Sequence, residues 1–318
     1  GVSTGGPPEQ AALRPLPPPE DRTRWPDAAN RTIWMYWAQG EHSLYLKSFE
    51  QPDNASLSAY GTSTYGKYRT GYRCLMGWRR LNPSWDVRLL NDAEAIRLSP
   101  AFSRLADRGV GKTQLWSDVL RLDLLARYGG VWADVSTCPV HTLEEWLPNY
   151  VAPTGFFSFW WKYDPVVLRR ELNCENAVTD PRDGNLGHTW GAADSRMIVT
   201  WFMAAPHPNH SLVTKWRDAT YDYVASLSHD QEYPYFICFC ELTLLMLRNE
   251  EIKSQLAAMP HVSGHPVLGD PFCCARPEHE VDPTMLMYKS PMAGANISDA
   301  AYEAWLASKE AEMEATRA

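Results

Sequence analysis

Residues 117–136 read SDVLRLDLLARYGGVWADVS and contain a complete pattern of helix, turn and strand. From Thr113 to Tyr128 apolar side chains recur every three or four residues, which defines one face of a helix. They are Leu115, Val119, Leu122, Leu125 and Ala126. Gly129-Gly130 ends this helix, and residues 131–135 form a short β-prone run. The sequence therefore predicts a helix that passes through a double-glycine turn directly into a strand.

Charged side chains within this stretch form a candidate site. Asp118 and Arg121 are three residues apart on the predicted helix, so they share a face and can present a carboxylate and a guanidinium to one ligand. A surface ion pair is the simpler interpretation of that spacing. The double glycine favours a site instead, because it lets the chain double back and directs Asp134, at the end of the strand, toward the helix.

The segments upstream of this stretch predict two more strands. Residues 33–37 (IWMYW) form an apolar, aromatic run that stops at Gln39-Gly40, as a buried strand ending in a loop does. Residues 41–69 are polar and predict a long surface loop, residues 72–81 a helix, and residues 85–90 a strand.

The downstream half continues the alternation of strands and helices. Strands are expected at 156–161 and 197–203, helices at 208–227 and 235–248, and a charged amphipathic helix at 299–317. Such alternation favours a mixed α/β sheet, in which ligands gather at the carboxyl ends of the strands.

Composition suggests a domain organisation. Residues 1–27 hold seven of the 24 prolines, which favours an extended stem or linker. We expect one catalytic domain over residues 28–298 and a separate helix over 299–318. The chain begins without Met, and we expect that a signal peptide or membrane anchor precedes it.

Charge and aromatic content narrow the class of ligand. With 30 Lys and Arg against 38 Asp and Glu, the 318-residue chain has a net charge of −8, which argues against nucleic acid as a partner. The 14 Trp residues fit either a Trp-rich core or a site that stacks flat rings and sugar faces.

Cysteines and glycosylation motifs favour a secretory compartment. Seven Cys fit a lumen with some disulfides and leave at least one thiol unpaired. No C-x-x-C occurs, so zinc bound by thiolates is disfavoured. Four N-x-Ser/Thr motifs begin at Asn30, Asn54, Asn209 and Asn296, slightly more than chance gives.

The pattern S-D-x-x-R-x-x-L-L-x-x-Y-G-G-V-W-x-D closely resembles the donor-binding motif of the capsular-polysaccharide-synthesis and glycosyltransferase family 32 group, retaining nucleotide-sugar transferases of the GT-A fold. The resemblance extends to residues 33–40, to the N-P-x-W-x-V segment at 82–87 and to residues 234–236 and 288–289. It thus spans about residues 32–290 and implies a GT-A-like, mixed and mostly parallel sheet flanked by helices.

The resemblance also implies roles for individual residues. Asp118 and Arg121 would hold hydroxyls and phosphate of the donor, Asp134 would face its diphosphate, and Trp34 or Trp37 would stack its base. The catalytic group is Asp134, Asp118, Arg121 and Asp194. The donor-binding group is Trp34, Tyr36, Trp37, Gln39, Ser117, Asp118, Arg121, Gly130 and Lys289.

A divalent cation, Mn²⁺ or Mg²⁺, is implied as cofactor, with Asp134, Ser136 and His265 as its candidate ligands. Ser136 departs from the family pattern because it stands where the second Asp of a D-x-D motif is expected. A hydroxyl is a weaker ligand for a hard cation than a carboxylate, which puts metal dependence in question.

The resulting hypothesis is a glycosyltransferase that moves a sugar from a nucleotide sugar, with UDP-sugars favoured, to a glycan acceptor with retention of configuration. It would act in the Golgi or secretory lumen, as a type II membrane protein whose anchor precedes residue 1. A non-catalytic carbohydrate-binding or scaffolding relative with a degenerate D-x-D motif is the alternative. A glycoside hydrolase is disfavoured because no motif places a second acid against Asp134.

Overall fold

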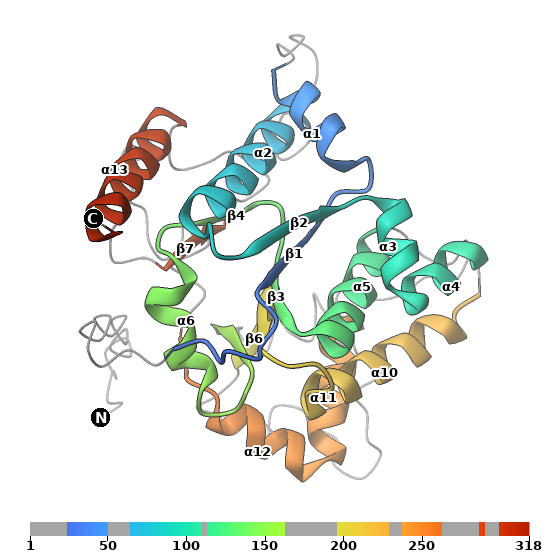
Figure 1. The fold of residues 1–318 in the computed structure, drawn as a ribbon. Coiled ribbons are helices and arrows are strands. Elements are labelled where there is room, and N and C mark those ends of the chain that lie inside the picture. The colour runs from blue at the N-terminus through green and yellow to red at the C-terminus, as the bar shows by residue number, and fades with distance from the viewer. Residues whose placement is uncertain are drawn as a thin grey trace, which may run out of the picture.

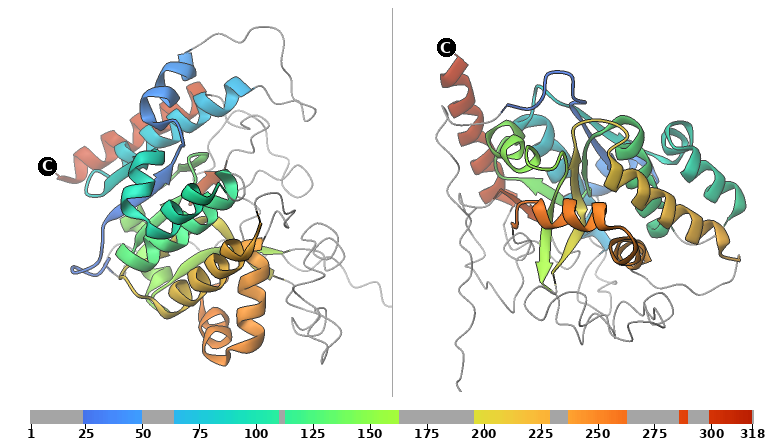
Figure 2. Two further views of the ribbon diagram at one scale, coloured as in Figure 1. Left: turned by 90° about the vertical axis from the view of Figure 1, so that its right-hand side faces the viewer. Right: turned by 90° about the horizontal axis from the view of Figure 1, so that it is seen from below.

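The computed structural model describes residues 24–49, 64–109, 113–162, 196–228, 237–262, 286–289 and 299–317. Within them, a central sheet lies between two layers of helices (Figures 1 and 2). Its strands are β1 (Thr32–Tyr36), β2 (Asp86–Leu90), β3 (Gly130–Ala133), β5 (Phe157–Lys162) and β6 (Arg196–Ala205).

The sheet has the strand order β2-β1-β3-β6-β5. β1 runs parallel to both β2 and β3, whereas β6 runs antiparallel to β3 and to β5. Four of the five strands therefore point the same way and β6 alone is reversed. This confirms the predicted mixed, mostly parallel α/β sheet.

Helices cover both faces of the sheet. In the described part of the chain, the helices are α1 (Gly40–Phe49), α2 (Thr64–Leu81), α3 (Asp92–Leu98), α4 (Pro100–Arg108), α5 (Thr113–Tyr128), α6 (Leu143–Val151), α10 (Ser211–Ser226), α11 (Ile237–Arg248), α12 (Glu250–Ala258) and α13 (Asp299–Arg317). The α5 bounds are those that the apolar spacing predicts.

Side chains of β1 alternate between two cores, as the period of two in a strand requires. Ile33 and Met35 are buried with Trp78 of α2 and Trp146 of α6. Trp34 and Tyr36 face the other way and are buried with side chains of α3, α4, α5 and α10. Helix α5 thus covers the face of the sheet on which Trp132 of β3 lies.

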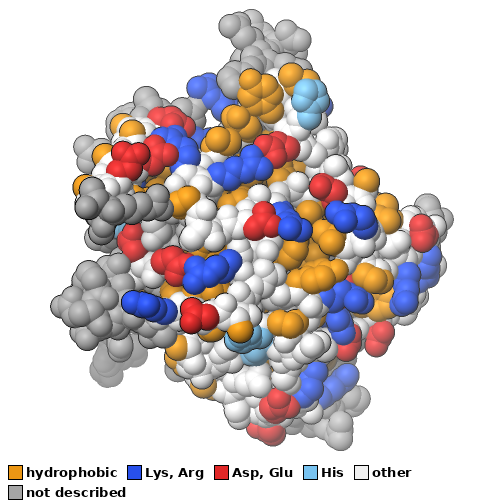
Figure 3. All heavy atoms as spheres, in the orientation of Figure 1, with side chains coloured by type: hydrophobic (Ala, Val, Ile, Leu, Met, Phe, Trp, Pro, Cys, Tyr) orange, Lys and Arg blue, Asp and Glu red, His pale blue; other side chains and the backbone are white. Residues whose placement is uncertain are grey.

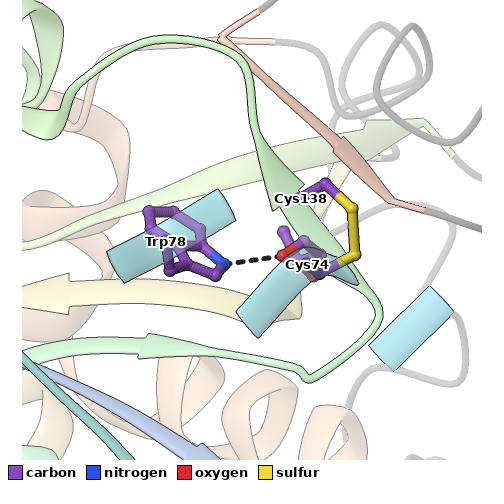
Figure 4. The surroundings of a disulfide bond; sticks show 4 residues. Cys74, Trp78 and Cys138 are labelled. Atoms are coloured by element: carbon purple, nitrogen blue, oxygen red, sulfur yellow. Dashed lines mark hydrogen bonds between the residues drawn. A yellow bond between two sulfur atoms is a disulfide. The ribbon is translucent and has the colours of Figure 1, made fainter. Parts of the chain in front are cut away.

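A disulfide joins α2 to a second, small sheet. β4 (Thr137–Pro139) pairs antiparallel with β7 (Met287–Lys289). Cys74 of α2 is bonded to Cys138 of β4, and the Trp78 indole N–H donates to the Thr137 carbonyl at 2.6 Å (Figure 4). These contacts hold the chain that follows β3 against α2.

The C-terminal helix is present as predicted. α13 lies beside α2 (Figure 1), with Leu306 buried between them near the disulfide. Arg80 of α2 binds Glu303 at 2.6 Å and Glu310 at 2.7 Å. The helix is therefore packed on the domain that carries the sheet.

The structure differs from the expectations for the N-terminal part at two places. The loop expected over residues 41–69 contains α1 and the first turns of α2. Trp25, inside the expected stem, is buried and packs against Trp85 with ring centroids 5.0 Å apart. The packed structure therefore includes Trp25, near the end of the expected stem; residues 1–23 lie outside the described part of the chain, so the rest of the stem stays a prediction.

The described surface mixes both signs of charge. On the face shown in Figure 3, Lys and Arg side chains are interspersed with Asp and Glu. Across the ranges given above, no helix has the length and apolar character needed to cross a bilayer.

Candidate functional site

The Gly129-Gly130 turn places the end of α5 directly against the start of β3. Both glycines have positive φ, at 69° and 97°. A Cβ on Gly129 would lie 2.8 Å from the Pro206 carbonyl oxygen, and one on Gly130 only 2.5 Å from that of Thr32. Both backbone conformation and lack of space therefore require glycine here.

Asn30 holds this turn from outside. Its Nδ2 donates to the Tyr128 carbonyl at 2.9 Å, and its Oδ1 accepts from the Thr32 hydroxyl at 2.6 Å. The Asn30 side-chain nitrogen, to which a glycan would be attached at this motif, is thus hydrogen-bonded within the protein. Asn209, in the second described motif, is exposed; Asn54 and Asn296 lie outside the described residues.

Arg121 is the centre of the candidate site. Its side chain is 7% exposed, and Nη2 lies 3.2 Å from Asp118 Oδ1 and 3.6 Å from Asp134 Oδ1. It also donates to the Ser117 hydroxyl at 3.1 Å and to the Thr200 carbonyl at 2.9 Å. The predicted meeting of Asp118, Arg121 and Asp134 is confirmed in space.

Asp134 stands where β3 ends, and 27% of its side chain is exposed. Its main-chain N–H bonds the Trp201 carbonyl, and its own carbonyl accepts from the Thr137 N–H in a tight turn. The Trp132 indole N–H donates to Asp134 Oδ1 at 3.0 Å. The carboxylate is therefore oriented by its strand neighbour while keeping access to solvent.

Asp118 is buried beside this group. Burial raises its pKa to about 6; the Arg121 guanidinium opposes the shift and the nearby Asp134 charge adds to it. Asp118 and Asp134 contact the same guanidinium nitrogen, so a second acid lies close to Asp134 although no sequence motif pairs the two.

Three predicted donor contacts lie at the carboxyl end of β1. Tyr36 is buried, and its hydroxyl donates to Asp92 at 2.5 Å; burial and the Asp92 carboxylate raise its pKa. Trp37 is half-buried and meets Tyr68 edge to face at 5.3 Å, and Gln39 is exposed. Tyr36 and Asp134 each lie two residues beyond the paired Trp34 and Trp132, so both end at the same edge of the sheet.

Two other predicted donor contacts do not reach this edge. Trp34 is 3% exposed in the core, and its indole N–H donates to the Gly129 carbonyl at 2.9 Å. Gly130 is buried at the opposite end of β3 from Asp134. We therefore assign Trp34 and Gly130 to the fold rather than to donor binding.

The turn after β3 brings Ser136 and Lys289 near each other along the backbone. Ser136 is half-buried between Asp134 and β4, and its neighbour Thr137 pairs with Lys289 of β7. Asp194 and His265 lie outside the described residues, so their proposed roles stay predictions.

The sequence pattern missed the Thr200 carbonyl, because nothing local to either segment marks a contact between α5 and β6. The contact between Trp132 and Asp134 does have a signal in the sequence. The two residues are two positions apart at the end of a strand, and residues so spaced share a face.

The thiols fit the predicted mixture of disulfides and unpaired Cys. Cys240 is disulfide-bonded, as are Cys74 and Cys138, whereas Cys238 is a buried free thiol within the described ranges. Burial raises the pKa of the Cys238 thiol, so it is a poor nucleophile or metal ligand.

The residues around Asp134 fit a hard divalent cation of the kind that shares a substrate phosphate. Mg²⁺ or Mn²⁺ in such sites takes one or two carboxylates together with phosphate oxygens. Asp134 supplies a partly exposed carboxylate, and Ser136 adds a hydroxyl in the same turn. Among the side chains that the structure describes, His, Cys, Asp and Glu form no group of three or more suited to holding a metal.

Comparison with known proteins identifies one family. The family model described as capsular polysaccharide synthesis protein matches residues 73–268, a range that includes α5, the double glycine and Asp134. No curated protein matches the chain. A solved structure, "PaToxG Glycosyltransferase", is 12% identical over 72% of this chain and 74% of that one, with a TM-score of 0.37.

Proposed function

The chain belongs to the capsular polysaccharide synthesis protein family, and from this we propose that it is a glycosyltransferase that moves a sugar from a nucleotide sugar to a glycan. The convergence of Asp118, Arg121 and Asp134 at the carboxyl end of β3 is the observation that carries the proposal. Ligands of open α/β sheets bind at that edge.

Transfer of a glycosyl group needs electrostatic stabilisation more than covalent chemistry. As the anomeric C–O bond breaks, positive charge grows on the sugar and negative charge on the departing diphosphate. Asp134, partly exposed and oriented by Trp132, would hold the divalent cation that neutralises the leaving group. Ser136 and the lysine of β7 are the nearest further candidates along the backbone.

Arg121 acts in this proposal mainly as an organiser. Its guanidinium is almost fully enclosed and contacts Asp118, Asp134, Ser117 and the Thr200 carbonyl. It thereby links the two carboxylates, and in this proposal Asp118 would accept hydrogen bonds from hydroxyls of the donor sugar. UDP-sugar as donor, retention of configuration and a secretory location are part of the same proposal.

The decisive experiment is hydrolysis and transfer with a panel of sugar nucleotides in the presence of Mn²⁺. We expect Asp134→Ala and Asp118→Ala to abolish both reactions while the circular dichroism spectrum stays native. Asp123→Asn is the matched control, because Asp123 is buried on the same helix but binds Ser99, Arg127 and Arg217. Full activity in either alanine variant would reject the proposal.

Ser136 is the observation that favours a second function, a carbohydrate-binding protein without turnover. Calorimetric titration of nucleotide sugars with and without Mn²⁺ separates the two. A transferase should bind its donor more tightly with the metal and hydrolyse it slowly. A binding protein should take up glycan and show neither metal-linked donor binding nor hydrolysis.

A further inference from the structure

Trp132 touches both charged partners of the site with different parts of one side chain. It is 1% exposed. Its indole N–H donates to Asp134 Oδ1 at 3.0 Å, and the Arg121 guanidinium carbon lies 5.2 Å from the centre of its ring. The ring face thus supports the cation while the ring edge holds the anion.

We propose that Trp132 is a positioning residue that fixes the Asp134 carboxylate and the Arg121 guanidinium relative to each other. The inference rests on the proposed function of this site and adds the Trp132 indole to Arg121 as a group that orients Asp134. Trp132 itself touches no reacting atom in this proposal.

Of its partners Arg121 and Trp132, Trp132 lies closer to the Asp134 carboxylate. The Arg121–Asp134 separation of 3.6 Å exceeds the 2.7–2.9 Å of a good charge-assisted hydrogen bond, whereas the indole bond is 3.0 Å. Asp134 follows the strand and is partly exposed, so its side chain needs a fixed donor to keep one rotamer. Trp132 supplies such a donor from a position enclosed in the core.

Trp34 pairs with Trp132 in the sheet and provides a comparison for the contacts of the Trp132 indole. Its indole N–H also has an acceptor, the Gly129 carbonyl at 2.9 Å, and Arg88 lies 5.7 Å from its ring. A buried indole N–H ordinarily finds a partner. At Trp132 the partner is a carboxylate at the end of a strand, and the cation over the ring contacts the same carboxylate.

Trp132→Phe tests the proposal, because it keeps an aromatic ring and removes the N–H. Trp216→Phe is the matched control, since Trp216 is fully buried and its N–H donates to the Cys238 carbonyl at 2.7 Å. We expect Trp132→Phe to lower kcat for donor hydrolysis 10- to 100-fold and to raise the Mn²⁺ concentration for half-maximal rate. Equal kinetics in the two variants would overturn the proposal.

Indole N–H resonances of protein labelled with ¹⁵N-tryptophan give a readout that needs no activity. The signal missing in Trp132→Phe identifies Trp132, and we expect it to shift in Asp134→Asn. An unmoved signal would also overturn the proposal. If the wild-type protein hydrolyses no nucleotide sugar, the proposed function fails, and the resonance alone then decides whether Trp132 orients Asp134.

Discussion

Arg121 donates from Nη1 to the main-chain carbonyl of Thr200 at 2.9 Å, across 79 residues of sequence. This bond ties α5 to β6, the one reversed strand of the sheet. The orientation of the guanidinium is therefore set by the tertiary fold as well as by its helical neighbours Ser117 and Asp118.

Arg121→Lys should behave as a severe substitution despite keeping the charge. An ammonium group cannot reproduce the planar set of donors that reaches Ser117, Thr200 and both aspartates. Breaking a buried ion pair costs about 3 kcal/mol or more. We expect loss of donor hydrolysis and a lower midpoint in chemical denaturation. Arg127, on the same helix, has a 40% exposed side chain and pairs with the buried Asp123, which Ser99 and Arg217 also contact. Arg127→Lys should therefore change stability by less than about 1 kcal/mol.

The Asp118 carboxyl should make the protein less stable as pH rises. Its pKa is 3.8 when exposed and about 6 in the fold. The native state therefore keeps this proton to a higher pH than the unfolded state does. The stability that the protonated carboxyl contributes below pH 4 is lost as pH rises through 6. The shift corresponds to about 3 kcal/mol.

Asp118→Asn removes this titration. The free energy of unfolding of the variant minus that of the wild type should increase by about 2 kcal/mol between pH 4 and pH 7, which is most of the full effect. Urea denaturation at several pH values measures the difference, in which carboxyls common to both proteins cancel. A difference independent of pH would contradict the raised pKa.

Gly130→Ala should destabilise the protein more than Gly155→Ala does. Both glycines have positive φ, so both substitutions carry a backbone cost of about 1–2 kcal/mol. A Cβ at Gly130 also meets the Thr32 backbone oxygen at 2.5 Å, whereas at Gly155 it meets only the His210 ring at 3.3 Å. Thermal melting measures both, and equal losses of Tm would mean that the close approach of β1 at Gly130 is unimportant.

Ser136→Asp should strengthen metal binding if Ser136 faces the same ion as Asp134. A second carboxylate suits a hard cation better than a hydroxyl. We expect a severalfold lower Kd for Mn²⁺ in calorimetric titrations made with UDP present. Ser136→Ala is the control and should weaken binding or leave it unchanged. Weaker binding by Ser136→Asp would place residue 136 outside the metal site.

The sequence predicted the parts of the site that depend on neighbours in the chain. The spacing of Asp118 and Arg121, the double glycine and Asp134 all lie within one short stretch, and the structure brings them together as expected. Helix α1 was missed because its residues show little separation of apolar and polar faces.

Contacts between distant segments were not predictable in the same way. The pattern around Trp34 suits a strand whether its indole stacks a ligand or donates to Gly129, and only the packing of β1 against the glycine turn distinguishes the two. The pairing of Thr137 with Lys289 likewise joins segments that share no local signal.

The Cys74–Cys138 disulfide closes a covalent ring of chain that contains β2, α3, α4, α5 and β3. Asp118, Arg121 and Asp134 all lie on this ring. A single proteolytic cut between the two cysteines would therefore leave both pieces linked, and the protein would separate into fragments on a denaturing gel only after reduction. A cut outside the ring would release a fragment without reductant, unless another disulfide spans it.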